Sequence, residues 1–366
     1  MSEKVYLVFT VLFIGTTLGF GLCFLFLGIP KATFLNSYKL ARRAMACAYI
    51  VLSILNMLEI IIRHDDDNDI RLAHAITLII GAFQAFLFTY TFICLINSRY
   101  VTKNKIILET IPITLLGIAV LATYINTAWS AYFKGVYNVF LIYYLFVMVR
   151  YPVVFLKEFR NYTLRADNYF SEQETARFKW IYYSFFAFFA IGVVAMGLTF
   201  TANEVYYVCF TVALIAFYSY FGIKFIDYAF RYQYMEPVAA ETGNPQREFS
   251  FESTFEPALN QWIDAEKFLQ PGLTVEQLAR ELNTNRTYLS NYINHVEQKT
   301  FRTWINDLKI DKSKEILLAQ PNLPVMEVAS IVGYNDGSNF NKQFVKNTGV
   351  SAQAWRMQNM KKPAAV

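Results

Sequence analysis

Residues 75–96 read AITLIIGAFQAFLFTYTFICLI, and none of these residues is charged. A helix that crosses a lipid bilayer needs about 20 predominantly apolar residues. The stretch has that length and that composition. It therefore predicts a membrane-spanning α-helix.

Further apolar runs flank this stretch, so that such runs fill the chain from residue 5 to about residue 226. They are Val5–Leu27, Ala44–Ile62, Ile106–Ile125, Val136–Phe155, Trp180–Thr201 and Val205–Ile226. The first run is too long for the core of a signal peptide and is followed by no small-residue cleavage site, so we expect it to remain as a helix. Over the whole chain 17% of the residues are charged, against about 25% in a typical soluble domain. The sequence predicts a seven-transmembrane helix bundle over residues 1–231.

Lysine and arginine residues are unevenly divided between the segments that join the runs. Thirteen of them lie in the segments after the first, third and fifth runs, and four lie in the N-terminal segment and the alternate loops. Loops rich in Lys and Arg stay on the cytoplasmic side of a membrane. The charge pattern therefore predicts an N-terminus outside the cell and, after seven crossings, a C-terminal region in the cytoplasm.

The composition changes after the seventh run. Residues 232–254 read YQYMEPVAAETGNPQREFSFEST, and the helix breakers Pro237, Gly243 and Pro245 indicate a linker. Residues 255–366 have the pattern of a soluble helical domain, with 13 basic and 11 acidic residues. A net charge of +2 is only weak evidence for binding to nucleic acid.

The C-terminal domain contains an internal repeat with an offset of 50 or 51 residues. In each copy a short amphipathic helix, a turn and a second amphipathic helix follow one another. A small residue, Ala279 or Ala329, allows the two helices to cross closely. Asn283 or Gly333 stands in the turn, where a left-handed conformation is common. The pattern predicts two helix-turn-helix motifs, and the residues suited to cap their helices are Thr274 with Gln277, Asn285 and Asp336.

A charged helix is predicted between the two copies, over roughly residues 300–319, with Trp304, Leu308, Ile316 and Leu317 along one face. About 18 residues at 1.5 Å each span about 27 Å, which is close to the ~34 Å of one turn of DNA. Such a spacer would hold the second helices of the two motifs for contact with two successive major grooves.

Two stretches of this domain resemble the DNA-binding domain of the AraC/XylS transcription regulators. Residues 273–293, LTVEQLARELNTNRTYLSNYI, are similar to the first motif of that family, and residues 333–356, GYNDGSNFNKQFVKNTGVSAQAWR, resemble its second motif. The resemblance implies a bipartite domain that binds double-stranded DNA, usually as a homodimer on repeated sites, and that can act on RNA polymerase. It also implies a bacterial protein and, together with the seven helices, a location in the bacterial inner membrane.

The second helix of each motif has a face opposite its buried anchors. The expected anchors are Leu289 and Ile293 in the first motif and Phe340 and Phe344 in the second, and a helix turns by 100° per residue. The residues on the opposite face, where the resemblance places base readers, are Arg286, Thr287, Ser290, Asn291, Ser338, Asn341 and Lys342. Arg and Lys can pair with guanine, and Asn with adenine. Lys346 lies one turn further along and suits a phosphate.

Polar residues inside the apolar runs suggest a ligand site. Asn56 and Glu59 lie in the second run and Gln84 lies in the third, and ionisable residues within a membrane are functional candidates. The alternatives are that Glu59 pairs with Arg63 near the membrane surface and that Gln84 forms a bond between helices. The outer segments are too short for a folded sensor domain, so a small molecule or a lipid would act within the helices, or a partner protein would supply the signal.

These features predict an all-α protein, with a seven-transmembrane helix bundle followed by a cytoplasmic AraC-type double helix-turn-helix domain. The predicted function is that of a membrane-bound transcription regulator in signal transduction. The alternative is a transporter, or another membrane protein, with an accessory helix-turn-helix domain. The sequence has no HExxH zinc-protease pattern and no metal-ligand spacing among its four cysteines, so we expect neither an enzyme nor a cofactor.

Overall fold

The computed structural model of the chain describes residues 3–28, 36–65, 70–172, 175–198, 204–231 and 255–360. Within these residues the regular secondary structure is helical, and one isolated bridge joins Phe170 to Thr274. The predicted all-α fold class is therefore confirmed. The chain forms two compact units: unit 1 comprises Met1–Tyr162 and Phe178–Glu241, and unit 2 comprises Thr163–Arg177 and Thr242–Val366.

Residues 163–177 belong to unit 2, whereas the sequence placed them within the domain at 1–231. The predicted linker at 232–254 lies outside the described residues.

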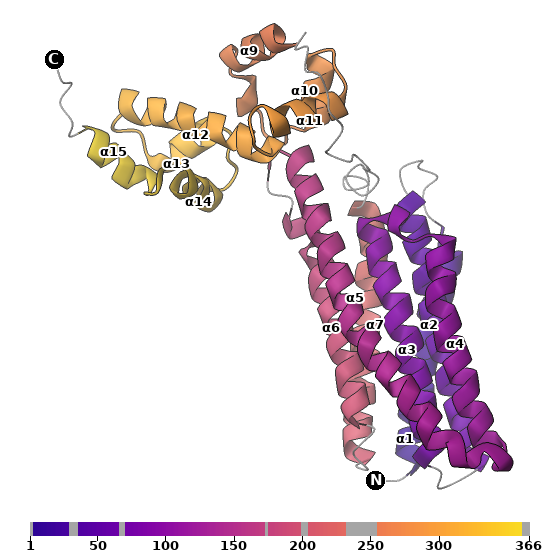
Figure 1. Cartoon of the computed structure of the whole chain (residues 1–366). Helices are drawn as coiled ribbons and strands as arrows, with labels where there is room; N and C mark the ends of the chain where they lie inside the picture. Colours follow the sequence, from indigo (N-terminus) through magenta and orange to yellow (C-terminus); the bar gives the residue numbers. More distant parts are fainter. Residues whose placement is uncertain are drawn as a thin grey trace. The chain divides into compact units, whose positions relative to one another are not determined.

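Seven long helices make up most of unit 1 (Figure 1). They are α1 (Glu3–Phe26), α2 (Asn36–Asp65), α3 (Ile70–Ile96), α4 (Lys103–Ile125), α5 (Phe133–Tyr169), α6 (Thr175–Leu198) and α7 (Glu204–Arg231). Each is long and apolar enough to cross a membrane, so the predicted set of seven helices is confirmed. α1 packs against α2 and α7, and α2 packs against α3. Two short 3-10 helices, η2 (Ser98–Tyr100) and η3 (Thr127–Tyr132), precede α4 and α5.

Aromatic rings form much of the core of unit 1. Phe155 of α5 stacks on Phe185 of α6 at a centroid distance of 3.8 Å, and Phe92 of α3 meets Phe185 edge-on at 5.9 Å. Such pairs contribute about 0.5–1.5 kcal/mol each beyond the burial of their area. The outer surface is apolar too, since Leu108 and Val149 each leave 69% of their surface exposed. Contiguous exposed apolar surface is rare in soluble monomers, and it suits contact with lipid.

A buried ion pair joins α4 to α5. The carboxylate of Glu109, which is 3% exposed, accepts hydrogen bonds from Nη1 of Arg150 at 3.0 Å and from the hydroxyl of Tyr151 at 3.0 Å. The hydroxyl of Tyr90 donates a third at 3.3 Å. Buried charges that are paired and hydrogen-bonded cost far less than isolated ones. This pairing accounts for one charged residue in each of the apolar runs Ile106–Ile125 and Val136–Phe155.

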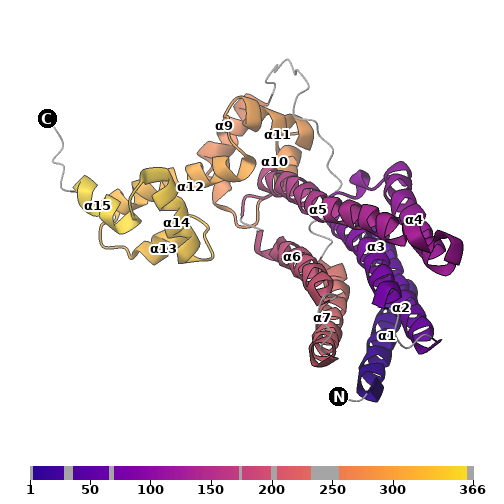
Figure 2. The ribbon, with the colours of Figure 1, turned by 60° about the horizontal axis from the view of Figure 1, so that its bottom comes forward.

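Unit 2 contains a set of shorter helices besides the end of α5 (Figure 2). They are α9 (Glu256–Asp264), α10 (Val275–Glu281), α11 (Arg286–His295), α12 (Phe301–Ala319), α13 (Val325–Ile331), α14 (Gly337–Thr348) and α15 (Ala352–Met360), with the 3-10 helix η5 (Lys267–Leu269) after α9. The pairs α10–α11 and α13–α14 are the two predicted helix-turn-helix motifs. α12 joins them and shares a core with the second pair, formed by Ile310, Leu317, Val328, Phe340 and Phe344.

The predicted helix caps are confirmed. Thr274 and Gln277 form a capping box at the start of α10, Asn285 caps α11 and Asp336 caps α14 through their side-chain oxygens. Each cap satisfies a backbone N–H that the first turn of a helix leaves without a partner. The first residues of α10, α11 and α14 are therefore set by local chemistry.

The turns of the two motifs adopt the left-handed backbone that the sequence predicts. Asn283 has a φ of 53° and Gly333 has a φ of 77°. At Gly333 a Cβ atom would stand 2.0 Å from the carbonyl oxygen of Leu269. Only glycine fits there, because both the conformation and the close approach of a second backbone exclude a side chain.

Candidate DNA-binding surface

The first motif exposes part of the predicted contact face. Leu289 and Ile293 are fully buried as anchors, Thr287 is exposed, and Arg286 and Ser290 are half-buried. These positions agree with the predicted face of α11. Their contact with DNA stays a prediction.

Asn291 departs from the prediction, because its side chain is only 7% exposed. The prediction assumed that α11 is covered on the Leu289–Ile293 side alone. In the structure α9 also packs on this helix: the ring of Phe255 lies 5.0 Å from that of Tyr292, whose hydroxyl donates to Glu256 at 2.8 Å. α11 is thus buried on more than one side, and the expected outward position of Asn291 is wrong.

The second motif exposes its whole predicted contact face. The residues of α14 that the sequence singled out are all exposed, namely Ser338, Asn341, Lys342 and Lys346. Phe340 and Phe344 are fully buried in the core of the second motif. α14 therefore offers a polar and basic face on a firmly anchored helix, and this face can enter a groove about 12 Å wide.

Helix α12 places the two motifs on one continuous element. It has 19 residues, which corresponds to about 28 Å at 1.5 Å per residue. Of the predicted apolar face, Trp304 and Leu317 are buried, and Leu308 and Ile316 are half-buried. The predicted spacer is therefore present as one helix.

Lys309 of α12 is a buried cation that the sequence analysis missed. It is 3% exposed, and its Nζ donates to the carbonyl oxygen of Gly333 in the turn of the second motif at 3.1 Å. Burial lowers the pKa of Lys309 to about 8. The signal was available, because Lys309 stands four residues after Ile305 and four before Ser313, and both are buried in the same helix.

The last turns of α5 contact the first motif within unit 2 (Figures 1 and 2). The carboxylate of Asp167 pairs with the guanidinium of Arg302, in the first turn of α12, at 2.5 Å. The hydroxyl of Tyr169 donates to Oε2 of Glu276 in α10 at 2.7 Å. The guanidinium of Arg286, the first residue of α11, lies 5.5 Å from the centre of the Tyr169 ring, within the range of a cation–π interaction.

Backbone contacts extend this interface beyond the end of α5. The N–H of Ser171 donates to the carbonyl oxygen of Leu273 at 2.9 Å, and the N–H of Gly272 donates to Oε1 of Glu172 at 2.7 Å. Phe170 and Thr274 form the isolated bridge next to them. The segment 167–172 is therefore attached to the first motif by side chains and by backbone. The sequence analysis missed this contact because it counted only the basic residues of this segment.

The charges at this interface are complementary, because each carboxylate lies beside an arginine. Glu276 accepts from the hydroxyl of Tyr169 and pairs with Arg280 at 2.8 Å, and these partners together with Arg286 hold the pKa of Glu276 below its ordinary value. Two carboxylates, Asp167 and Glu276, thus lie beside arginines at the start of α11 and α12. A DNA phosphate that approaches these arginines has to compete with these two carboxylates.

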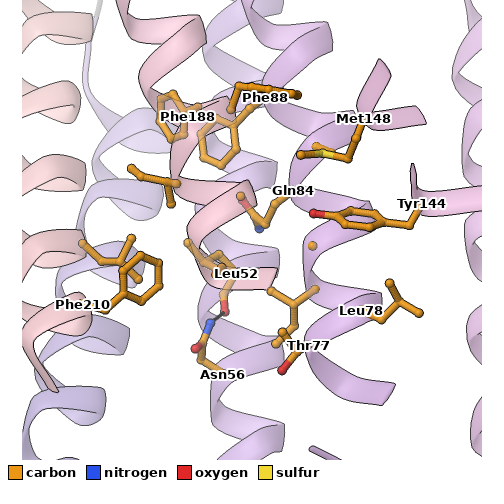
Figure 3. A pocket seen from close by; sticks show the side chains of 18 of the residues that line it. Leu52, Asn56, Thr77, Leu78, Gln84, Phe88, Tyr144, Met148, Phe188 and Phe210 are labelled. Atoms are coloured by element: carbon orange, nitrogen blue, oxygen red, sulfur yellow. Dashed lines mark hydrogen bonds between the residues drawn. The ribbon is translucent and has the colours of Figure 1, made fainter. Parts of the chain in front are cut away.

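The predicted ligand residues of unit 1 are partly brought together. Asn56 and Gln84 both line a cavity of about 220 Å³ among the helices of unit 1 (Figure 3). The side chain of Glu59 lies outside the described residues. Gln84 donates to the carbonyl oxygen of Ala48 on α2 at 3.2 Å, so the alternative role of Gln84 as a bond between helices is also present.

Comparison with known proteins finds a match for the C-terminal region. Residues 278–358 match a family model described as a helix-turn-helix domain. A solved structure similar to this chain is the C-terminal domain of AraT, a response regulator from Geobacillus stearothermophilus, with 29% sequence identity over 31% of this chain and 95% of that chain and a TM-score of 0.27. No curated protein matches the chain. The C-terminal region carries an AraC-type helix-turn-helix domain, as its two motifs predicted.

Proposed function

We propose that the chain is a membrane-bound transcription regulator that binds specific double-stranded DNA with α11 and α14 in two successive major grooves. The observation that carries this proposal is the open face of α14, where Asn341 and Lys342 are exposed beside the buried anchors Phe340 and Phe344. An asparagine and a lysine on such a face can discriminate adenine and guanine by about 1–3 kcal/mol each. The proposal includes a homodimer on repeated sites and an effect on RNA polymerase, both of which come from the AraC/XylS resemblance.

The experiment for DNA binding uses fragments that the full chain binds in bacterial cells. These fragments are titrated with purified protein in lipid nanodiscs, for the native chain and for the double variant Asn341→Ala, Lys342→Ala. We expect the double variant to lose at least tenfold in affinity and to relax its choice of sequence at two positions. Gln358→Ala, an exposed position on α15, is the matched control and should bind normally. Unchanged binding by the double variant would remove α14 from the groove.

The membrane part of the proposal is supported by the seven long apolar helices and by the exposed aliphatic side chains on their outer surface. The charge pattern of the loops favours a multi-pass protein of the bacterial inner membrane with the C-terminal domain in the cytoplasm. The test is a pair of fusions to a reporter that is active only in the cytoplasm. We expect activity for a fusion after Tyr232 and none for a fusion after Asp67. The reverse pattern would keep the domain away from DNA.

We further propose that unit 1 controls DNA binding through α5. α5 is assigned as one helix from Phe133 to Tyr169, with Pro152 inside it. Its end contacts Arg286 of the first motif and Arg302 at the start of α12. While this contact holds, Arg286 is directed to Tyr169 rather than to a base, and Asp167 adds a negative charge beside the DNA-binding face. Release of the end of α5 would remove both contacts. A signal that acts on α5 in unit 1 would therefore change the affinity of the C-terminal domain for DNA.

A further inference from the structure

The cavity of unit 1 is lined by side chains from most of its helices (Figure 3). Its volume of about 220 Å³ exceeds the ~150 Å³ of an engineered protein cavity that binds benzene. It therefore has room for one or two small rings. Protein interiors rarely contain empty spaces larger than a water molecule. A cavity of this size is therefore a candidate ligand-binding site.

The walls of the cavity are apolar and aromatic. Phe88 of α3 and Phe188 of α6 stack at a centroid distance of 4.0 Å at one side, and Leu52, Leu78, Met148 and Phe210 contribute further apolar surface. Among the described residues that line the cavity there is no Asp, Glu, Lys or Arg, and the lining has one imidazole, that of His74. The walls thus offer no permanently charged group to offset the lost hydration of an ion, which favours an uncharged ligand.

Three polar groups reach this apolar space without a full set of partners. Oε1 of Gln84 is buried and has no hydrogen-bond partner among the described residues. Asn56 donates through Nδ2 to the carbonyl oxygen of Leu52 at 2.7 Å, which leaves its amide oxygen to accept from another group. A buried acceptor without a donor is costly, and a ligand with an N–H or O–H group would satisfy it.

The third polar group, the hydroxyl of Tyr144, belongs to α5. The residue is 3% exposed, and its hydroxyl oxygen lies 3.1 Å from where a Cβ of Gly81 would stand. The absence of a side chain at Gly81 therefore lets Tyr144 extend across to α3. Figure 3 shows Tyr144 and Gln84 directed into the same space.

We propose that this cavity binds a small, uncharged aromatic molecule of one or two rings that donates a hydrogen bond to the amide oxygen of Gln84 or Asn56. The aromatic walls take the rings, the amide oxygens take the donor, and the lack of charged lining residues excludes ions. Tyr144 and Met148 place α5 in the wall, so such a ligand touches the helix whose far end contacts the first motif. A regulatory role for the ligand rests on the proposed function, whereas the binding itself does not.

The test uses three probes of matched size on the full chain, purified in nanodiscs without DNA. Indole has two rings and an N–H donor, indene has nearly the same shape without the donor, and indole-3-carboxylate adds a charge. Calorimetry should show saturable binding of indole, binding of indene that is about threefold to tenfold weaker, as expected for one hydrogen bond, and none of the carboxylate. Because DNA is absent, failure here leaves the proposed DNA binding untouched.

Four variants locate the site. If Gln84 is the acceptor, Gln84→Leu should lower the affinity for indole to that for indene. Continued binding of indene would show that the variant is folded. If Asn56 is the acceptor, Asn56→Leu should have this effect instead. Ala195→Leu adds bulk to a lining position and should abolish binding of both probes. Asn138→Leu, an exposed position on α5, is the matched control and should change neither. Equal affinity of the native chain for indole and indene would show that no lining group accepts a hydrogen bond from the ligand, and it would overturn the proposal. A preference for indole that survives both amide variants, or the absence of any saturable binding, would overturn it as well.

Discussion

The carboxylate of Asp167, near the end of α5, pairs with the guanidinium of Arg302 at the start of α12, 135 residues further along the chain and 2.5 Å away. Both side chains are mostly buried, with 19% and 17% of their surface exposed. An ion pair at the surface contributes little because water screens it, whereas a partly buried pair is screened much less. The pair therefore helps to hold the end of α5 on α12, while Tyr169 and the backbone bonds beside it hold that end on the first helix-turn-helix motif.

Asp167→Asn should strengthen DNA binding by the full chain. The change removes the ion pair, frees Arg302 and takes a negative charge away from the DNA-binding face. We expect a gain of about threefold to tenfold in affinity, measured in nanodiscs on a fragment bound in cells. Asp264→Asn removes the same charge from an exposed position on α9 and should have little effect. A loss of affinity in Asp167→Asn would mean that the contact supports DNA binding.

Lys346→Ala should weaken binding to every DNA sequence alike. Lys346 is exposed one turn beyond Lys342 on α14, where a cation meets phosphate and releases a bound counterion. The slope of log affinity against log salt should become shallower by about 0.9. Lys267→Ala, in η5, is the control, because Lys267 already pairs with Glu281 at 2.9 Å. An unchanged slope in Lys346→Ala would place this residue away from the phosphates.

Arg150→Met should destabilise unit 1, because it leaves the carboxylate of Glu109 buried without its cation. Breaking a buried pair costs about 3–5 kcal/mol, and since the side chain of Arg150 is 35% exposed, we expect the lower figure of about 1–3 kcal/mol. Thermal unfolding in detergent measures the effect. The double variant Glu109→Gln, Arg150→Met should recover most of the loss, and Lys157→Met, an exposed position on α5, should cause none.

Lys309 should make the stability of unit 2 depend on pH in the alkaline range. Its pKa is about 8 in the folded protein and 10.5 in its ordinary state, so between these values the unfolded chain binds more protons than the folded one. The free energy of unfolding therefore rises with pH from about 8 to about 10.5. Urea unfolding at several pH values measures this rise, and Lys309→Met should lack it. If the two proteins show the same pH dependence, Lys309 does not titrate in this range.

Most of the fold follows from local patterns. The apolar run at 75–96 predicts α3 within a few residues, and Asn285 and Asp336 begin α11 and α14 where cap chemistry requires. The end of α5 was missed for a physical reason: the apolar run stops near Phe155, but the helix continues to Tyr169. Length and hydropathy report where lipid could surround a helix, whereas a helix itself ends where its backbone loses hydrogen bonds.

The candidate site shows the same limit. Exposure of Asn341 and Lys342 could be predicted because two phenylalanine anchors fix the orientation of α14. Asn291 could not be placed correctly, because α9 covers a second side of α11 and belongs to neither motif. Tertiary contacts of this kind leave no mark in the spacing of a single helix.

Because Tyr144 and Asp167 lie on the same helix, the number of residues between them sets the angle between their directions around the helix axis. Each residue inserted between them would turn Asp167 by about 100° around the helix axis, and seven residues, nearly two full turns, would return it to almost the same direction. Asp167 and Arg302 both belong to unit 2, so their contact would survive an insertion before Thr163. Only the register between the cavity-lining turn of α5 and its last turn would change.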